Sequence, residues 1–130
     1  MLFRSAGSEH ALLASVGLAA RANHLAGELT LGMLKRLEVA RALALEPRLL
    51  LLDEPLAGLT SGEAADLLAF IGTLRSRISI IMVEHNVRLA LPICDRAVVM
   101  DAGAVIATGS PEAIRTNPEV VRAYLGEDAG

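Results

Sequence analysis

The chain has 130 residues, of which 53% are hydrophobic and 21% are charged, and this composition is typical of one globular domain rather than a disordered segment. The formal net charge of −3 and the scarcity of aromatic side chains argue against a module that binds nucleic acid through a basic, stacking surface. Cys94 is the single cysteine, which excludes a disulfide framework and fits a reducing cytoplasm. No apolar stretch approaches the roughly 18 to 20 residues that a membrane span needs.

Two helices are predicted before the first strand. Apolar residues within 10–18 indicate a short first helix. From Met33 onwards, leucine and alanine recur every three or four residues opposite charged side chains. This spacing predicts a second helix, with one apolar face, that ends before Pro47.

A strand, a helix and a second strand are predicted next. Residues 49–52 are four consecutive leucines, a pattern typical of a strand that is buried on both faces, and residues 78–83 predict a second strand. Between them, Thr60 and Glu63 form the sequence pattern of a capping box, and apolar residues follow at helical spacing. This order predicts a parallel pair with a right-handed crossover, and therefore the α/β fold class.

The C-terminal part is predicted to contain short helices around a β-hairpin. Residues 97–100 and 104–107 flank a short turn, as the two strands of a hairpin do. Gly126 is the predicted end of the last helix. Three residues are predicted N-caps, two of them directly before a proline: Asn86, Ser110 and Asn117.

Two acidic residues, Asp53 and Glu54, follow the four leucines directly. Ligands bind open α/β sheets at the carboxyl ends of the strands, so both acids are expected at a binding edge. Asp53 is the candidate to hold Mg²⁺ through its water shell, and Glu54 is the candidate general base that polarises a water molecule. The alternative is a strand that ends in two solvated acids.

His85 follows the second predicted strand, so it is expected at the same edge of the sheet. A histidine there would donate a hydrogen bond near a transferred phosphoryl group and stabilise its charge. The alternative is an ordinary surface histidine. The combination with Asp53 and Glu54 favours the functional interpretation.

Residues 29–33 stand at the start of the second predicted helix. A hydroxyl and free backbone amides at a helix N-terminus form a binding site for an anion. Residues 27–32 also fit the first half of a P-loop, but Met33 stands where a lysine is required and Leu34 where a hydroxyl is required. A P-loop at this position is therefore rejected.

In this order, the segments resemble ABC-transporter ATPase subunits, and the resemblance covers residues 10–126. Residues 49–55 match the Walker B motif, residues 56–59 match the D-loop of the dimer interface, and His85 matches the switch histidine. Gly58 of the D-loop also fits an ordinary turn before a helix. Residues 29–33 stand at the signature, commonly Leu-Ser-Gly-Gly-Gln, from which Leu31 and Met33 depart. By resemblance, four residues contact the ATP of a partner subunit: Thr30, Leu31, Gly32 and Met33.

Three segments are similar to the ATPase subunits of branched-chain amino acid importers, namely residues 36–43, 83–87 and 111–127. The resemblance implies ATP and Mg²⁺ as ligands, with Asp53 at the metal. It implies a second ABC ATPase subunit, transmembrane permease subunits and, indirectly, a periplasmic or extracellular solute-binding protein as partners. It places the chain on the cytoplasmic face of the cell membrane and implies no nucleic acid.

The sequence contains no P-loop and no glutamine, so the Q-loop of the family is absent as well. We expect a single partial ABC ATPase domain over 1–130, with parallel strands, covering helices, a C-terminal β-hairpin and short helices. The end of the helical subdomain with the signature helix is expected at about 10–46 and part of the catalytic core at 47–130. We expect a truncated form that does not hydrolyse ATP alone and whose sheet exposes an edge and apolar faces.

Two other functions stay open. In the first, the chain is a non-catalytic subunit whose Thr30 and Gly32 contact ATP bound by a full-length partner. In the second, it is an unrelated α/β interaction domain. The last alternative predicts that substitutions of Glu54 and His85 have no functional effect.

Overall fold

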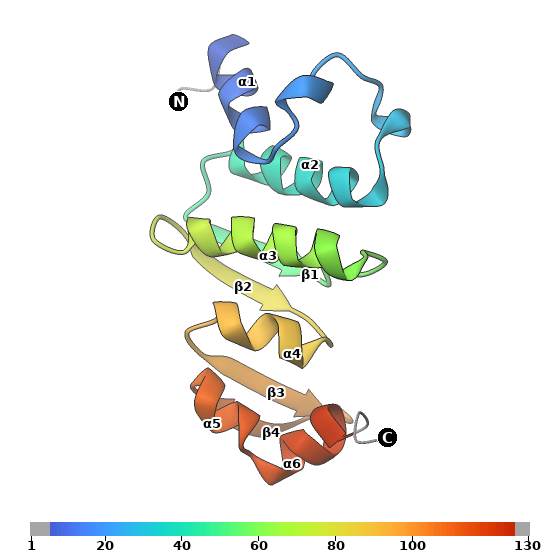
Figure 1. Cartoon of the computed structure of the whole chain (residues 1–130). Helices are drawn as coiled ribbons and strands as arrows, with labels where there is room; N and C mark the ends of the chain where they lie inside the picture. The colour runs from blue at the N-terminus through green and yellow to red at the C-terminus, as the bar shows by residue number, and fades with distance from the viewer. Residues whose placement is uncertain (1–5, 127–130) are drawn as a thin grey trace. The chain divides into compact units, whose positions relative to one another are not determined.

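A computed structural model describes residues 6–126 (Figure 1). The chain divides into two compact units, Met1–Val83 and Glu84–Gly130. The boundary predicted between residues 46 and 47 lies inside the first unit, and the subdomain assignment stays a prediction. The structure does not describe residues 1–5, which precede the region of resemblance. Glu127, the last residue of the segment 111–127 that is similar to branched-chain amino acid importers, also lies outside the described residues.

The first helix, α1, spans Ala6–Ser15 and ends in a left-handed turn at Gly17, whose φ is 73°. The N–H of Leu18 donates to Leu13 O at 2.8 Å and the N–H of Gly17 donates to Ala14 O at 3.0 Å, which is the Schellman pattern of a helix end. This turn folds Leu18 back into a core cluster with Val16 and Ala40. The predicted helix at 10–18 is therefore confirmed, with an earlier start and an earlier end.

The second helix, α2, spans Leu31–Leu43 and starts two residues before the predicted position. The cause is its N-cap, because Thr30 Oγ1 accepts a hydrogen bond from the N–H of Met33 at 3.3 Å. Two short 3-10 turns, Ala19–Arg21 and Ala26–Glu28, precede it. No strand leads into α2 within the described residues, whereas a P-loop follows a strand.

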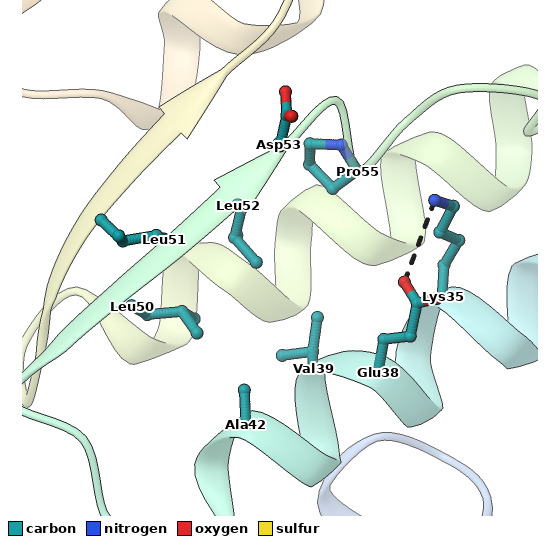
Figure 2. Close-up of a pocket in the computed structure, with 9 residues that line it drawn as sticks. All are labelled: Lys35, Glu38, Val39, Ala42, Leu50, Leu51, Leu52, Asp53 and Pro55. Atoms are coloured by element: carbon teal, nitrogen blue, oxygen red, sulfur yellow. Dashed lines mark ion pairs between the residues drawn. The ribbon is translucent and has the colours of Figure 1, made fainter.

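A parallel pair of strands forms the centre of the first unit. Strand β1, Leu49–Asp53, pairs with β2, Ser79–Val83, in a register that places Asp53 opposite Val83. Helix α3, Ser61–Leu74, joins the two strands and lies beside them in both views (Figures 1 and 2). Its capping box of Thr60 and Glu63 is present, and its predicted apolar face is buried: Ala64, Leu67, Leu68, Ile71 and Leu74.

The prediction that β1 is buried on both faces is wrong. Leu50 is only 3% exposed because it faces α2, whereas Leu51 is 67% exposed and points away from α2 in Figure 2. On β2, Ile81 and Val83 are each 57% exposed. Among the described residues of the first unit, helices cover one face of this pair and leave the other open. The expected exposed apolar face is thereby confirmed.

The second unit contains a hairpin packed against short helices. Strands β3, Ala97–Asp101, and β4, Ala104–Gly109, are antiparallel and confirm the predicted hairpin. The helices are α4, Val87–Ala90, followed by a 3-10 turn at Leu91–Ile93, then α5, Pro111–Arg115, and α6, Pro118–Val120, which continues as a wider turn over Val121–Leu125. The core consists of Leu91, Val99, Ala107, Ile114 and Val120.

The side chains of Asn86, Ser110 and Asn117 all accept hydrogen bonds from the first turns of their helices, as predicted. Cys94 is half-buried beside this core, and its thiol donates to Leu91 O at 3.3 Å, which fits a packing role. Within the described range, no helix is both long and apolar enough to cross a membrane.

Candidate functional site

Asp53 is the last residue of β1, and its exposed side chain lies at the carboxyl end of the parallel pair. The next residue, Glu54, continues the pairing through its backbone, since its N–H donates to Val83 O at 2.8 Å. The two acids are therefore delivered to one edge of the sheet by the strand itself. Parallel α/β sheets bind ligands at such an edge.

The backbone of Glu54 is left-handed, with φ of 45°, although the residue has a Cβ atom. Such a conformation costs about 1 to 2 kcal/mol and is found preferentially at functional sites. The next two residues of the turn, Pro55 and Leu56, are buried, and their packing fixes the conformation of the turn. The turn is closed by the N–H of Ala57, which donates to Glu54 O at 3.2 Å.

Gly58 follows in this turn with φ of 77°, a value that favours glycine. A Cβ atom added to Gly58 would lie 2.7 Å from Leu31 Cδ2. The structure thus brings Gly58 and Leu31, which are distant in the sequence, into direct contact. Sequence reasoning proposed both residues but did not predict that they touch.

The predicted anion site occupies the first turn of α2. Thr30 is exposed at the N-cap, and the bond that its oxygen accepts from Met33 leaves the hydroxyl proton for another acceptor. Gly32 is buried, and Leu31 is 46% exposed. The side chain of Met33 packs against the cluster around Leu18, so only its backbone belongs to the site.

His85 belongs to the second unit, where it lies exposed just after β2. Its carbonyl accepts a hydrogen bond from the N–H of Val87 at 3.0 Å, which fixes the backbone before α4. The structure brings Asp53, Glu54 and Gly58 into one turn region. The position of His85 relative to them stays a prediction.

A hollow of about 160 Å³ lies between α2 and β1 and reaches Asp53 and Pro55 (Figure 2). Most of the side chains that line it are apolar, and its one lysine, Lys35, pairs with Glu38 at 3.9 Å. Pockets for nucleotide-sized ligands are typically about 300 Å³ or larger, so this hollow is too small for ATP. The phosphate-binding elements of a nucleotide site are not among its lining residues.

Across residues 6–126 there is no group of three or more His, Cys, Asp or Glu side chains that would hold a metal ion by itself. Mg²⁺ at a phosphate site needs only one or two protein carboxylates, because phosphate oxygens and water complete its shell. The exposed carboxylate of Asp53 at the strand end fits that limited role.

Comparison with known proteins adds an independent observation. A family model described as ABC transporter matches residues 6–57, and one described as branched-chain amino acid ATP-binding cassette transporter matches residues 104–130. The chain is 47% identical, over 117 residues, to the high-affinity branched-chain amino acid transport ATP-binding protein BraF of Pseudomonas aeruginosa. That match covers 88% of this chain and 46% of BraF. The chain belongs to the ABC-transporter ATPase family.

Other ABC proteins agree with this assignment. LivG of Escherichia coli, also named for branched-chain amino acid transport, is 44% identical over the same share of both chains. The lipopolysaccharide export protein LptB of Haemophilus influenzae is 42% identical over 81% of this chain and 44% of its own length. This ABC chain spans about half the length of the curated relatives that it matches.

Solved ABC cassettes confirm the fold. The ADP form of MJ1267 superposes with a TM-score of 0.81 at 31% identity, covering 92% of this chain and 49% of the cassette. The cassette cbiO1 from Clostridium perfringens superposes with a TM-score of 0.77 at 29% identity, over 88% of this chain and 46% of its own. The predicted α/β P-loop NTPase fold class is correct, and this ABC chain contributes about half of such a fold.

Proposed function

We propose that this chain acts within the ATP-hydrolysing subunit of an ABC importer for branched-chain amino acids. The observation that carries the proposal is the strained turn after β1, where Asp53 ends the strand and Glu54 follows with φ of 45°. That geometry occurs in a chain 47% identical to a protein named for branched-chain amino acid transport.

Each proposed role follows from the chemistry of the side chain. Asp53 would hold Mg²⁺ through the water shell of the ion, and the bound ion would neutralise charge on the β- and γ-phosphates of ATP. Glu54 accepts a proton from the attacking water, and the imidazole of His85 donates a hydrogen bond to the γ-phosphate. Gly58 shapes the D-loop at the interface between two ATPase subunits.

The first turn of α2 is proposed to contact ATP held by the other subunit. Its free N–H groups and the hydroxyl of Thr30 suit a phosphate oxygen, and the absence of a side chain at Gly32 permits close approach. Leu31 replaces a usual signature residue and contributes its backbone N–H, whereas the N–H of Met33 already donates to Thr30 Oγ1. The partners would be a second ABC ATPase subunit, transmembrane permeases and, indirectly, a solute-binding protein, on the cytoplasmic face of the membrane.

We further propose that the chain alone does not hydrolyse ATP. Its sequence lacks the P-loop lysine and the glycines that precede it, so no loop holds the β- and γ-phosphates next to Asp53 and Glu54.

A second candidate function follows from the complete N-cap at Thr30, which forms without a P-loop. In that function the chain is a non-catalytic subunit that lends Thr30 and Gly32 to ATP on a full-length partner.

The deciding experiment measures Mg·ATP binding and hydrolysis by the purified chain, alone and mixed with a full-length homologous ATPase whose signature is disabled. We expect no binding by the chain alone and restored hydrolysis in the mixture. Thr30→Ala should reduce the restored rate, whereas Glu54→Gln should not, because the partner supplies the base for its own ATP. ATP binding by the chain alone would overturn the proposed dependence on a P-loop, and no hydrolysis in either case would overturn the role of the signature turn.

A further inference from the structure

Two helix N-termini meet in the first unit, and the first of them carries residues of the proposed site. The signature turn, defined as residues 30–33, starts α2, and the capping box of Thr60 and Glu63 starts α3 directly after the D-loop. The two helix starts are in contact at Gly32, the buried glycine of the signature turn. A Cβ atom added to Gly32 would lie 2.7 Å from Glu63 Oε1 and 2.9 Å from Glu63 Cδ.

The two carboxylate oxygens of Glu63 have different neighbours. Oε2 accepts hydrogen bonds from the N–H and from the hydroxyl of Thr60, both at 3.0 Å. Oε1 lies against Gly32 of the other helix. The carboxylate therefore closes the first turn of α3 and supports the first turn of α2 at the same time.

A second contact runs parallel to the first. Leu31 lies against Gly58 so closely that a Cβ atom at Gly58 would be 2.7 Å from Leu31 Cδ2. One turn further along, Arg36 of α2 pairs with Asp66 of α3 at 3.3 Å. Because close-packed contacts transmit displacement, the signature turn cannot shift without disturbing the D-loop or the start of α3.

We propose that Glu63 is a positioning residue that holds the signature turn against the D-loop and the start of α3. The inference rests on the proposed function, in which Thr30 and Gly32 contact the ATP of a partner subunit. It also explains the two unusual signature residues, since Leu31 packs on Gly58 and Met33 packs in the core around Leu18. The side chains of Leu31 and Met33 make contacts within the chain. Glu63 orients Thr30 and Gly32, the two residues proposed to contact ATP.

The first test is a double-mutant cycle on thermal unfolding of the 130-residue chain, with Gly32→Ala, Glu63→Ala and the double variant. Gly62 is a matched control, because it is likewise the second residue of its helix and a Cβ atom there would meet nothing within 4 Å. We expect Gly62→Ala to leave the Tm unchanged or raise it. Gly32→Ala should lower the Tm by roughly 3 to 6 °C, because the carboxylate must move and release its bonds to Thr60.

In the Glu63→Ala background, Gly32→Ala should behave as Gly62→Ala does, because the obstructing carboxylate is gone. Glu63→Gln should keep the Tm, since the amide oxygen still accepts the two bonds from Thr60. Equal Tm losses for Gly32→Ala in both backgrounds would overturn the proposed contact.

The second test uses the mixture with the signature-disabled full-length ATPase. We expect Glu63→Ala to raise the KM for ATP several-fold with little change in kcat, and Glu63→Gln to restore the KM. A merely structural role would lower kcat through loss of folded chain and leave the KM unchanged, which would overturn the positioning role. If the unaltered chain restores no hydrolysis, the proposed role of the signature turn fails together with the role of Glu63 towards ATP. The unfolding cycle would still decide whether Glu63 joins the two turns.

Discussion

Glu54 combines a strained backbone with the proposed catalytic role. A left-handed conformation costs a residue with a Cβ atom about 1 to 2 kcal/mol, and glycine avoids that cost. We therefore predict that Glu54→Gly is more stable than Glu54→Ala by about 1 kcal/mol in the free energy of unfolding. Urea denaturation of the two variants measures the difference, and alanine controls for loss of the carboxylate. Equal stabilities would show that the turn does not impose its positive φ of 45°.

The chemical role of Glu54 requires a complete nucleotide site for its test. We would fuse the chain to the part of BraF that lies outside the matched 117 residues, and measure ATP hydrolysis. A general base contributes about 100-fold or more to the rate, so Glu54→Gln should lower kcat by at least that factor while ATP still binds. Glu84→Gln, which directly follows β2 beside the proposed histidine, is the control. A fusion that keeps its full rate after the Glu54→Gln substitution would exclude Glu54 as the base.

At the scale of elements, the starts of several helices could be predicted from the sequence because their capping hydrogen bonds are local. Thr60, Asn86, Ser110 and Asn117 are caps in the structure as predicted, because each N-cap bond joins residues two or three positions apart. Contacts between elements could not be predicted in this way. Gly58 touches Leu31, and Gly32 touches Glu63, across separations that no helical or strand period encodes.

Burial of the strands was the other limit of the sequence analysis. Four consecutive leucines fit a strand covered on both faces, but covering depends on which other elements are present. In the described residues of the first unit, helices lie on one face of β1 only, so Leu51 is exposed although its neighbour Leu50 is buried. The pattern therefore identified the strand correctly and its surroundings incorrectly.

The hairpin of the second unit has a tight turn that its sequence only partly suits. Ala102 and Gly103 join β3 to β4, and both have positive φ, 47° and 80°. Two-residue turns of this kind favour Asn-Gly, because asparagine tolerates the left-handed conformation better than alanine. We predict that Ala102→Asn raises the free energy of unfolding by roughly 0.5 to 1 kcal/mol. Ala104→Asn, in the exposed start of β4, is the control, and an equal gain there would contradict the turn mechanism.

At the scale of the whole molecule, the decisive property is exposed apolar surface on the sheets. The open face of the first unit includes Leu51, 67% exposed, and Ile81, 57% exposed. The hairpin of the second unit also exposes Val98 and Val105, at 59% and 58%. The two surfaces are not equivalent, because antiparallel sheets commonly face water on one side whereas parallel pairs are normally covered on both.

We therefore predict that the isolated chain self-associates mainly through the open face of β1 and β2. Exposed apolar patches and unpaired strand edges are both routes to association. The double variant Leu51→Thr and Ile81→Thr removes apolar surface but keeps residues that are suited to strands. It should lower the weight-average mass measured by sedimentation and the amount of hydrophobic dye that the chain binds. The matched control is Val98→Thr with Val105→Thr, which removes similar surface from the antiparallel hairpin and should change the mass far less. A larger effect of the hairpin variant would place the association surface in the second unit, and a monomeric unaltered chain would contradict self-association altogether.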